Sequence, residues 1–296
     1  MSGTTASFRR KIQSARDLQS VVRTMKALAA SSIGQYEQSV RALGDYADTV
    51  KLGFAVCMRE TGSAAWMAGE TSSTNAAGIG ALVFGSDQGL VGQFNDVVAE
   101  EAVRTLAALP APAAVWAVGE RVHARLAEAG LPLHGLFSVP NSVQAIAALI
   151  GQILVQTEAR RSQGHITELH LFYNRPTSAV YAPVHQRLLP LDETWQRQLA
   201  ELPWPTKNLP EVQGDGTATL RALVREYLFI SLFRACAESL ASENASRLAA
   251  MQRADKNIEE LLENLSGTFH RLRQSGIDEE LFDVISGFEA LSAQQQ

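Results

Sequence analysis

The sequence is poor in the features that mark the commonest kinds of functional site. Its 296 residues include only two cysteines, Cys57 and Cys236, and two thiols that far apart make neither a disulfide framework nor a cysteine-based metal motif. No run of eighteen apolar residues occurs, so no segment is expected to span a bilayer. The formal net charge of −5 is the opposite of the basic excess that nucleic-acid-binding proteins carry. We therefore expect a protein that binds no nucleic acid.

Motifs of catalysis are also missing. The sequence contains no G-x-S-x-G and no H-E-x-x-H pattern, and its six histidines are scattered. The stretch Gly85–Asn95 follows a predicted strand and opens a helix, as phosphate-binding loops do. It lacks the lysine and the Ser/Thr of a P-loop and does not have G-x-G-x-x-G spacing. We expect no catalytic residue, no metal and no cofactor on this chain.

Proline is absent from both ends of the chain. All ten prolines fall between Pro110 and Pro210. Proline in a helix interior costs about 3 kcal/mol, so the two ends are free to form long helices and the middle is not.

The two ends carry the apolar spacing of a coiled coil. From Phe8 to Phe54, and again from Leu220 to Phe288, apolar residues recur at steps of three and four. Residues 1–60 hold nine Lys/Arg and five Asp/Glu, whereas residues 211–296 hold eight and fourteen, so opposite charges favour pairing of one end with the other. Gly267 and Gly276 are the expected weak points of the second helix.

The middle of the chain alternates short apolar runs with helical patterns, which predicts a partly parallel sheet in a compact α/β domain. Residues 61–78 are rich in Gly, Ser, Thr and Ala and are predicted to be a linker. The expected strands are Ile79–Phe84, Ala113–Val118, Ile166–Tyr173 and Ala179–Leu189, with a turn at Asn174-Arg175-Pro176, and the expected helices are Asn95–Leu109, Glu120–Glu128 and Asn141–Arg160.

The predicted fold is thus mixed α+β and α/β. A long antiparallel two-helix coiled coil is formed by residues 1–60 and 211–296, and a Rossmann-like α/β domain at 79–200 is inserted between them. Two polar sites stand out. Asp87 and Gln88 are candidates for a protein contact after the first strand, and Arg273-Gln274 interrupts an apolar stripe, where an arginine fork suits a carboxylate of another chain.

Five segments resemble the gamma subunit of F-type rotary ATP synthases, and they occur in family order. The first two, Arg10–Ser14 and Val22–Ser31, are similar to the family's N-terminal helix. The stretch Ser86–Asn95 is similar to its loop after the first strand. Met251–Asn257 and Arg273–Leu281 are similar to its C-terminal helix.

Three positions depart from the family pattern. The family usually has a basic residue where Gln88 stands, Thr or Ser at Asp278, and Gly-Ala at Gly287-Phe288. These departures indicate a divergent branch, such as the alternate synthase type that some bacteria carry beside the standard one.

The resemblance implies a central rotor shaft. In the family, the coiled coil rises into a ring of alternating alpha and beta subunits, while the inserted domain sits on the membrane c ring beside the epsilon subunit. Ion flow, of protons or sodium, turns the shaft and drives ATP synthesis or hydrolysis at beta. The expected location is the cytoplasmic face of a bacterial inner membrane, as a peripheral protein. ATP chemistry belongs to beta, which makes this chain a non-catalytic subunit.

The resemblance also implies residue roles. Met25 and Lys26 match a Met-Lys pair that packs near the C-terminal Arg-Gln in the family. Arg273 and Gln274 match that Arg-Gln, which contacts a beta-subunit loop during rotation. The remaining candidates, Asp87, Gln88 and Asn95, are expected at the foot of the shaft.

Two other hypotheses remain open from the residues alone. The first is a coiled-coil adaptor whose α/β domain binds a small ligand or nucleotide, which ligand binding by the isolated chain would favour. The second is a Rossmann-like enzyme with helical dimerisation arms, which would need a catalytic constellation that the sequence does not display.

Overall fold

The structure is a computed structural model that describes residues 4–61, 78–191, 199, 201–208, 210–214 and 216–293, without the side chains of 60, 61 and 287–293. Apart from residues 61 and 78, the predicted linker lies outside these residues. The chain divides into two units, one of residues 1–28 with 248–296 and one of residues 29–247. Among the described residues, no helix combines the length and apolar character needed to cross a membrane.

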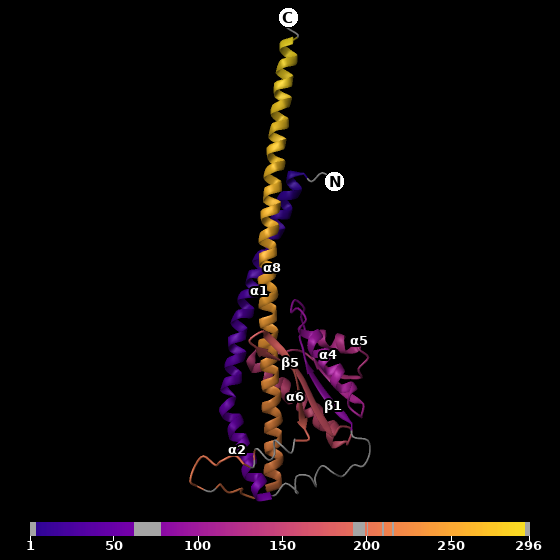
Figure 1. The fold of residues 1–296 in the computed structure, drawn as a ribbon, viewed down its shortest axis with the longest axis vertical. Helices are drawn as coiled ribbons and strands as arrows, with labels where there is room; N and C mark the ends of the chain where they lie inside the picture. Colours follow the sequence, from indigo (N-terminus) through magenta and orange to yellow (C-terminus); the bar gives the residue numbers. More distant parts are fainter. Residues whose placement is uncertain are drawn as a thin grey trace. The chain divides into compact units, whose positions relative to one another are not determined.

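Along the chain, the strands come between the N-terminal helices and the C-terminal helix, and the sheet lies to one side of α8 (Figure 1). The terminal helices are α1 (Thr5–Ala42), α2 (Gly44–Thr61) and α8 (Gly216–Ala293). The central elements are β1 (Ile79–Phe84), α4 (Phe94–Ala107), β2 (Ala113–Val118), α5 (Glu120–Glu128), β3 (Leu133–Phe137), α6 (Val143–Ser162), β4 (Glu168–Thr177) and β5 (Val180–Leu189).

The terminal helices follow the proline-free segments closely. The N-terminal pattern, expected as one helix, is interrupted by a single turn residue at Leu43, just before Gly44. Gly267 and Gly276, the expected weak points, do not interrupt α8, which continues through both as one helix of 78 residues. A glycine inside a helix costs only about 1 kcal/mol, which a helix of this length tolerates.

The described strands form a five-stranded sheet in the order β3-β2-β1-β4-β5. β1 lies between β2 and β4 and is parallel to both, β3 is parallel to β2, and β5 is antiparallel to β4. This is the partly parallel sheet that the alternating pattern predicts. The carboxyl ends of β1 and β2 meet at one edge, where the loop of residues 85–93 begins.

The apolar residues of β1 and β2 are buried on both faces of the sheet, because helices cover each face. Ala81 and Val83 of β1 pack with α4 and α5, while Leu82 and Phe84 pack on the other face with α6, α2 and part of α8. Side chains alternate between faces along a strand, and continuous apolar runs are typical of strands buried on both faces. The short apolar runs at 79–84 and 113–118 therefore predict both ends of β1 and β2 correctly.

Two details of the central domain differ from the sequence prediction. The strand β3 was not expected. The predicted turn at Asn174-Arg175-Pro176 was wrong, because these residues lie within β4 and the turn falls at Ser178-Ala179. Beyond Phe172, β4 pairs only with β5, and proline is tolerated where a strand lacks a second neighbour. The boundaries 79–200 of the inserted domain stay a prediction, because 192–198 and 200 lie outside the described residues.

Candidate functional site

The unit formed by residues 1–28 and 248–296 is an antiparallel helix pair with a narrow apolar seam. The seam's buried residues are Ala15 and Val22 of α1 and Met251 and Ile258 of α8. Met25 is half-buried and packs against them. The contacts run antiparallel, since Arg9 lies over the Phe269 ring at 5.9 Å while Arg23 meets Asp255.

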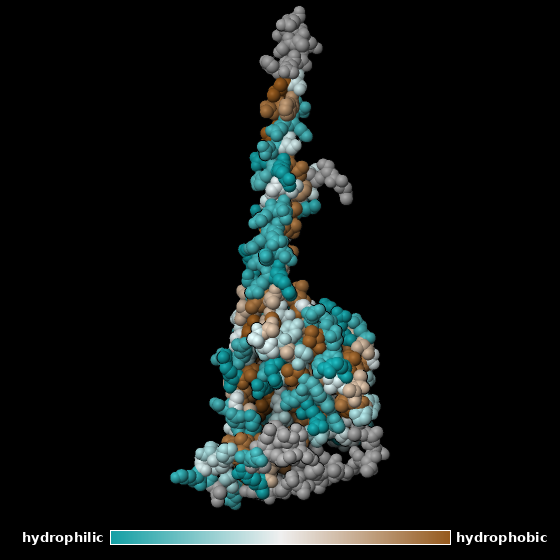
Figure 2. All heavy atoms as spheres, in the orientation of Figure 1, coloured by the Kyte–Doolittle hydropathy of each residue, from teal (hydrophilic) through white to brown (hydrophobic). Residues whose placement is uncertain are grey.

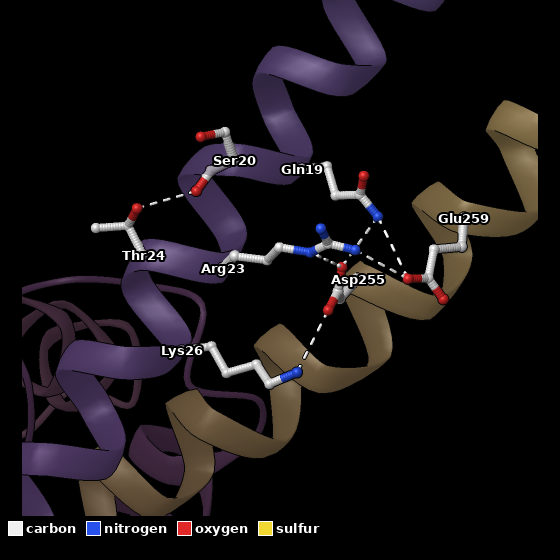
Figure 3. Close-up of polar contacts among 7 residues, drawn as sticks. All are labelled: Gln19, Ser20, Arg23, Thr24, Lys26, Asp255 and Glu259. Atoms are coloured by element: carbon white, nitrogen blue, oxygen red, sulfur yellow. Dashed lines mark hydrogen bonds and ion pairs between the residues drawn. The ribbon is translucent and has the colours of Figure 1, made fainter.

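Beside the seam, three α1 side chains converge on two carboxylates of α8 (Figure 3). Arg23 donates from Nε to Asp255 at 3.2 Å and from Nη2 to Glu259 at 3.0 Å. Lys26 Nζ reaches the second oxygen of Asp255 at 3.3 Å. Gln19 donates to Asp255 at 3.2 Å and to Glu259 at 3.5 Å. We call these five residues the polar ladder.

Asp255 is the centre of the polar ladder. Only 8% of this residue is exposed. Burial by itself would raise the pKa of its carboxyl, but hydrogen bonds from Lys26, Gln19 and Arg23 outweigh burial and hold that pKa below its ordinary value of 3.8. Glu259, by contrast, has a side chain that is 55% exposed. The pairing of the helices therefore depends on Asp255 more than on Glu259.

Replacing Asp255 by asparagine is expected to weaken the helix pair and to change its response to acid. A carboxyl whose pKa is lowered by folding stabilises the fold above its unfolded pKa, and that stabilisation is lost as pH falls through the folded pKa. The wild-type helix pair should thus lose stability below about pH 3.8, and the variant should lose less over the same range. Amide hydrogen exchange in α1, followed against pH, measures both effects. Glu259→Gln is the matched control, and an equal effect of the two variants would contradict the central role of Asp255.

The structure separates Lys26 from Arg273. The resemblance implied that the Met25-Lys26 pair packs near the C-terminal Arg-Gln, but Lys26 bonds Asp255. Arg273 is eighteen residues further along α8, which corresponds to about 27 Å at 1.5 Å per residue. That expected proximity was wrong for this chain, and contact of Met25 and Lys26 with a partner stays a prediction.

Arg273 and Gln274 are both exposed on α8. Among the described residues neither side chain makes a hydrogen bond or an ion pair, so both are available to another molecule. Figure 2 shows hydrophobic side chains gathered on the stretch of α8 that follows. The large apolar residues exposed there are Ile277, Leu281, Phe282, Val284 and Ile285. A contiguous apolar patch of this kind is typical of a protein contact surface.

Asp87 is occupied within its own domain. Its carboxylate accepts the backbone N–H of Glu120, at the start of α5, at 3.0 Å, and the backbone N–H of Val139, after β3, at 2.9 Å. The side chain therefore joins the loop after β1 to the loops after β2 and β3. This structural role was not foreseen from the sequence.

Asn95, the second residue of α4, is buried and bonded to the loop that precedes this helix. Its Oδ1 accepts the Ser86 N–H at 2.9 Å and its Nδ2 donates to Ser86 Oγ at 2.8 Å. The side chain of Gln88 is exposed, as is 63% of Leu90, whose φ is +63°. An exposed leucine in the left-handed region is unusual. Of the three foot candidates, Gln88 alone points its side chain to solvent, and partner contact by any of them stays a prediction.

The histidines gather more than the sequence suggested. His170 is buried, with Nε2 at 3.1 Å from Glu168 and Nδ1 at 2.8 Å from Nε2 of His185. Burial, followed by the neighbouring His170, lowers the pKa of His185. Within the described ranges, no group of three or more His, Cys, Asp or Glu side chains could hold a metal ion. His170 of β4 and His185 of β5 therefore form a hydrogen bond between neighbouring strands.

Sequence reasoning named Lys26 but missed the other four residues of the polar ladder. Gln19, Arg23, Asp255 and Glu259 were not singled out, although the opposite charge balance of the two ends was the signal. Pairing the two predicted helices in antiparallel register would have brought these residues together, because polar residues that flank an apolar seam face each other across a coiled coil.

Comparison with known proteins covers almost the whole chain. A family model described as ATP synthase matches residues 4–291. The ATP synthase gamma chain of Parafrankia sp. (strain EAN1pec) is 28% identical over 302 aligned positions, covering 99% of each chain. That of Moorella thermoacetica is 27% identical, covering 96% of this chain and 98% of its own.

Solved structures share the fold. A chain of the Euglena gracilis mitochondrial ATP synthase, in a structure of its OSCP, F1 and c-ring, aligns with a TM-score of 0.60 at 17% identity, covering 99% of this chain and 96% of that one. A chain of the Tetrahymena thermophila enzyme, from its central stalk and c-ring, gives a TM-score of 0.54 at 22% identity, covering 79% and 99%.

The terminal helix pair, the inserted mixed sheet and the order of the matched segments agree with the family along the whole described chain. Since the family model spans residues 4–291 and the named relatives match end to end, the chain belongs to the ATP synthase gamma-chain family.

Proposed function

We propose that this chain is the central rotor shaft of a rotary ATP synthase. It couples ion flow through a membrane c ring to ATP synthesis or hydrolysis at the beta subunits of an alpha–beta head, and it contacts an epsilon subunit. As part of a membrane-bound synthase it is a peripheral membrane protein. Its bacterial relatives support a location on the cytoplasmic face of a bacterial inner membrane.

The observation that carries the proposal is the end-to-end family match joined to an exposed contact surface on α8. This helix is uninterrupted for 78 residues, about 117 Å along its axis at 1.5 Å per residue. Close to its described end it presents Arg273, Gln274 and the apolar residues that follow them. A shaft needs a surface of this kind, free for other subunits.

The coupling follows from differential contacts. A helix pair has no rotational symmetry about its axis when one helix carries a basic, polar edge and the other an acidic one. Each orientation of such a shaft makes different contacts with the surrounding beta subunits and biases each toward a different nucleotide affinity. Turning it changes those affinities in sequence, which is coupling between distant sites.

Purification of the tagged chain from its native membranes, followed by mass spectrometry, tests the proposal. We expect alpha and beta ATPase subunits in molar excess over this chain, together with epsilon and c subunits. A control purification with the tag alone sets the background. Recovery of the chain alone, or only with unrelated proteins, would sink the rotor assignment.

The adaptor hypothesis is not favoured, because the family match accounts for both terminal helices and the inserted domain together. Saturable binding of a small ligand or nucleotide by the isolated chain would support the adaptor hypothesis instead.

A further inference from the structure

A stripe of polar residues on α8 is buried against the inserted domain, and no feature described above uses it. Glu238, Ser242 and Ser246 are spaced by four residues, which places them on one side of the helix. All three are buried, and they belong to the same unit, residues 29–247, as the sheet. Burying a polar group costs free energy unless it is hydrogen-bonded, so the partners of these side chains show what the stripe does.

The two serines bond backbone carbonyls of the inserted domain. Ser246 Oγ donates to the carbonyl of Val91, in the loop after β1, at 2.5 Å. Ser242 Oγ donates to the carbonyl of Asn174, in β4, at 3.0 Å. The side chain of Asn174 is fully buried and donates in turn to the carbonyl of Phe94, at the start of α4, at 2.8 Å. The serines therefore join α8 to the edge of the sheet where β1 ends beside β4.

Glu238 adds an ion pair one helical turn earlier. Its side chain is only 8% exposed, and its carboxylate accepts Arg175 Nε of β4 at 2.9 Å and Arg234 Nε of α8 at 2.7 Å. Asn174 and Arg175 lie beyond the last β4 residue that pairs with β1, and α8 supplies bonds to them instead. We call Glu238, Ser242 and Ser246, with their bonds to the domain, the register contacts.

The register contacts lie at the point where open α/β sheets usually bind ligands. The helices that connect β1, β2 and β3 cover one face of the sheet, and α6, which connects β3 to β4, covers the other. The neighbouring strands β1 and β4 thus form the topological switch point, and ligands bind outside the carboxyl ends of the strands at such a point. Here Ser242 and Ser246 bond the chain at this place, so α8 takes the position of a ligand in its own domain.

Hydrogen bonds fix the register of a helix in a way that apolar contacts do not. Apolar burial is non-directional, so a helix held by it alone can turn or slide slightly with little change in buried area. A hydrogen bond needs its donor and acceptor within about 3.2 Å and at a favourable angle. A shift of α8 by one residue would move each side chain about 1.5 Å along the axis and about 100° around it. Such a shift breaks all three register contacts together.

We propose that Glu238, Ser242 and Ser246 are positioning residues that hold α8 in one register within the inserted domain, so that torque on this domain passes to the shaft without slip. The register is a property of this chain alone, and only the passing of torque rests on the proposed rotor function. From Ser246, α8 continues uninterrupted to its described end. A rotation that enters the helix at the register contacts is therefore carried along the rest of its length.

Distance measurement by double electron–electron resonance on the purified chain tests the register. Spin labels on Ala124→Cys in α5 and Ala222→Cys in α8, both at exposed positions, report where α8 lies relative to the domain, while the native cysteines are buried. Ser242→Ala with Ser246→Ala should broaden the distance distribution about twofold or add a second distance, because each hydrogen bond favours its register by only about two- to tenfold. An unchanged distribution would overturn the proposal.

Ser239 offers a matched control on the same helix. It is 3% exposed, and its Oγ has no hydrogen-bond partner in the described part of the chain. Ser239→Ala therefore removes a buried hydroxyl without removing a bond to the domain, and it should leave the distribution as in the wild type. Equal broadening by Ser239→Ala would show that packing sets the register, and it too would overturn the proposal. If circular dichroism shows that the double variant does not fold, Ser242→Ala and Ser246→Ala singly carry the same prediction.

In the assembled synthase, the register contacts predict a loss of coupling without a loss of hydrolysis. The detached alpha–beta–gamma complex turns the shaft without load from the membrane ring, so its ATP hydrolysis should be unchanged in the double variant. ATP synthesis by membrane vesicles loads the inserted domain and should fall about fivefold or more, since two bonds that each favour the register about two- to tenfold are lost. An equal loss of both activities, or a loss of neither, would overturn the passing of torque. Recovery of alpha and beta subunits with the tagged wild-type chain tests the rotor function separately.

Discussion

Replacing Arg273 and Gln274 together by alanine is expected to lower rotation-coupled ATP turnover by about tenfold or more, with the fold intact. Both side chains are exposed and bond no other side chain among the described residues, so their removal leaves no buried group unpaired. In the assembled enzyme they are proposed to engage a beta-subunit loop. A hydrogen bond to a charged group contributes about 1.5–3 kcal/mol, and each 1.4 kcal/mol lost from a transition state is about tenfold in rate.

The chain offers a matched control for this experiment. Gln252 and Arg253 are the same two residue types, adjacent on the same helix and also exposed, but they lie in the stretch paired with α1. Gln252→Ala with Arg253→Ala should leave coupled turnover within about twofold of wild type. Turnover would be measured as ATP synthesis by membrane vesicles, with thermal unfolding of the purified variant as the check on fold. Normal turnover by the Arg273/Gln274 variant would count against the contact.

Sequence periodicity correctly predicted the strands that are buried on both faces and the helices that are buried on one face. The strands β1 and β2 and the helix α5 begin and end where predicted, because their apolar runs and flanking glycines are unambiguous. β3 was missed for a physical reason. It is a short edge strand, with Gly135 and a half-exposed pattern, so it carries neither strict alternation nor a continuous apolar run. At Leu43 the sequence misled in the opposite way, because the apolar repeat continues through the turn that separates α1 from α2.

The candidate site residues were harder to predict than the fold. Arg273 and Gln274 were singled out because they interrupt an apolar stripe, which is a local signal, and the structure shows both side chains exposed. The pairing of Lys26 with Asp255 depends on the register between segments more than two hundred residues apart in sequence, which periodicity alone does not give. The role of Asp87 inside its own domain was missed for another reason, because its partners are backbone N–H groups. The side chains of Glu120 and Val139 give no sign that their backbone N–H groups are donors. The Asp87 carboxylate therefore looked unbonded in the sequence, whereas the structure shows it accepting two hydrogen bonds.

Replacing Asp87 by alanine should lower the free energy of unfolding of the α/β unit by about 3 kcal/mol. The two backbone N–H groups that it accepts, at Glu120 and Val139, would lose a charged acceptor, and hydrogen bonds to charged groups contribute about 1.5–3 kcal/mol each. Thermal or denaturant unfolding measures the loss. Hydrogen exchange at the amides of these two residues reports it locally, and both should exchange faster in the variant.

Two further variants decide whether Asp87 acts inside the domain or toward a partner. Asparagine retains one acceptor oxygen, so Asp87→Asn should recover part of the lost stability and protect one of the two amides. Gln88→Ala, next in the chain and exposed, should change stability by no more than about 0.5 kcal/mol. If Asp87→Ala were as stable as Gln88→Ala but assembled poorly with the other subunits, the contact role would hold. A loss of stability in the isolated chain would instead show that Asp87 acts inside the domain, where its carboxylate connects three loops at the edge of the sheet. Gln88 and Leu90 would then be the residues that the loop after β1 exposes to a partner.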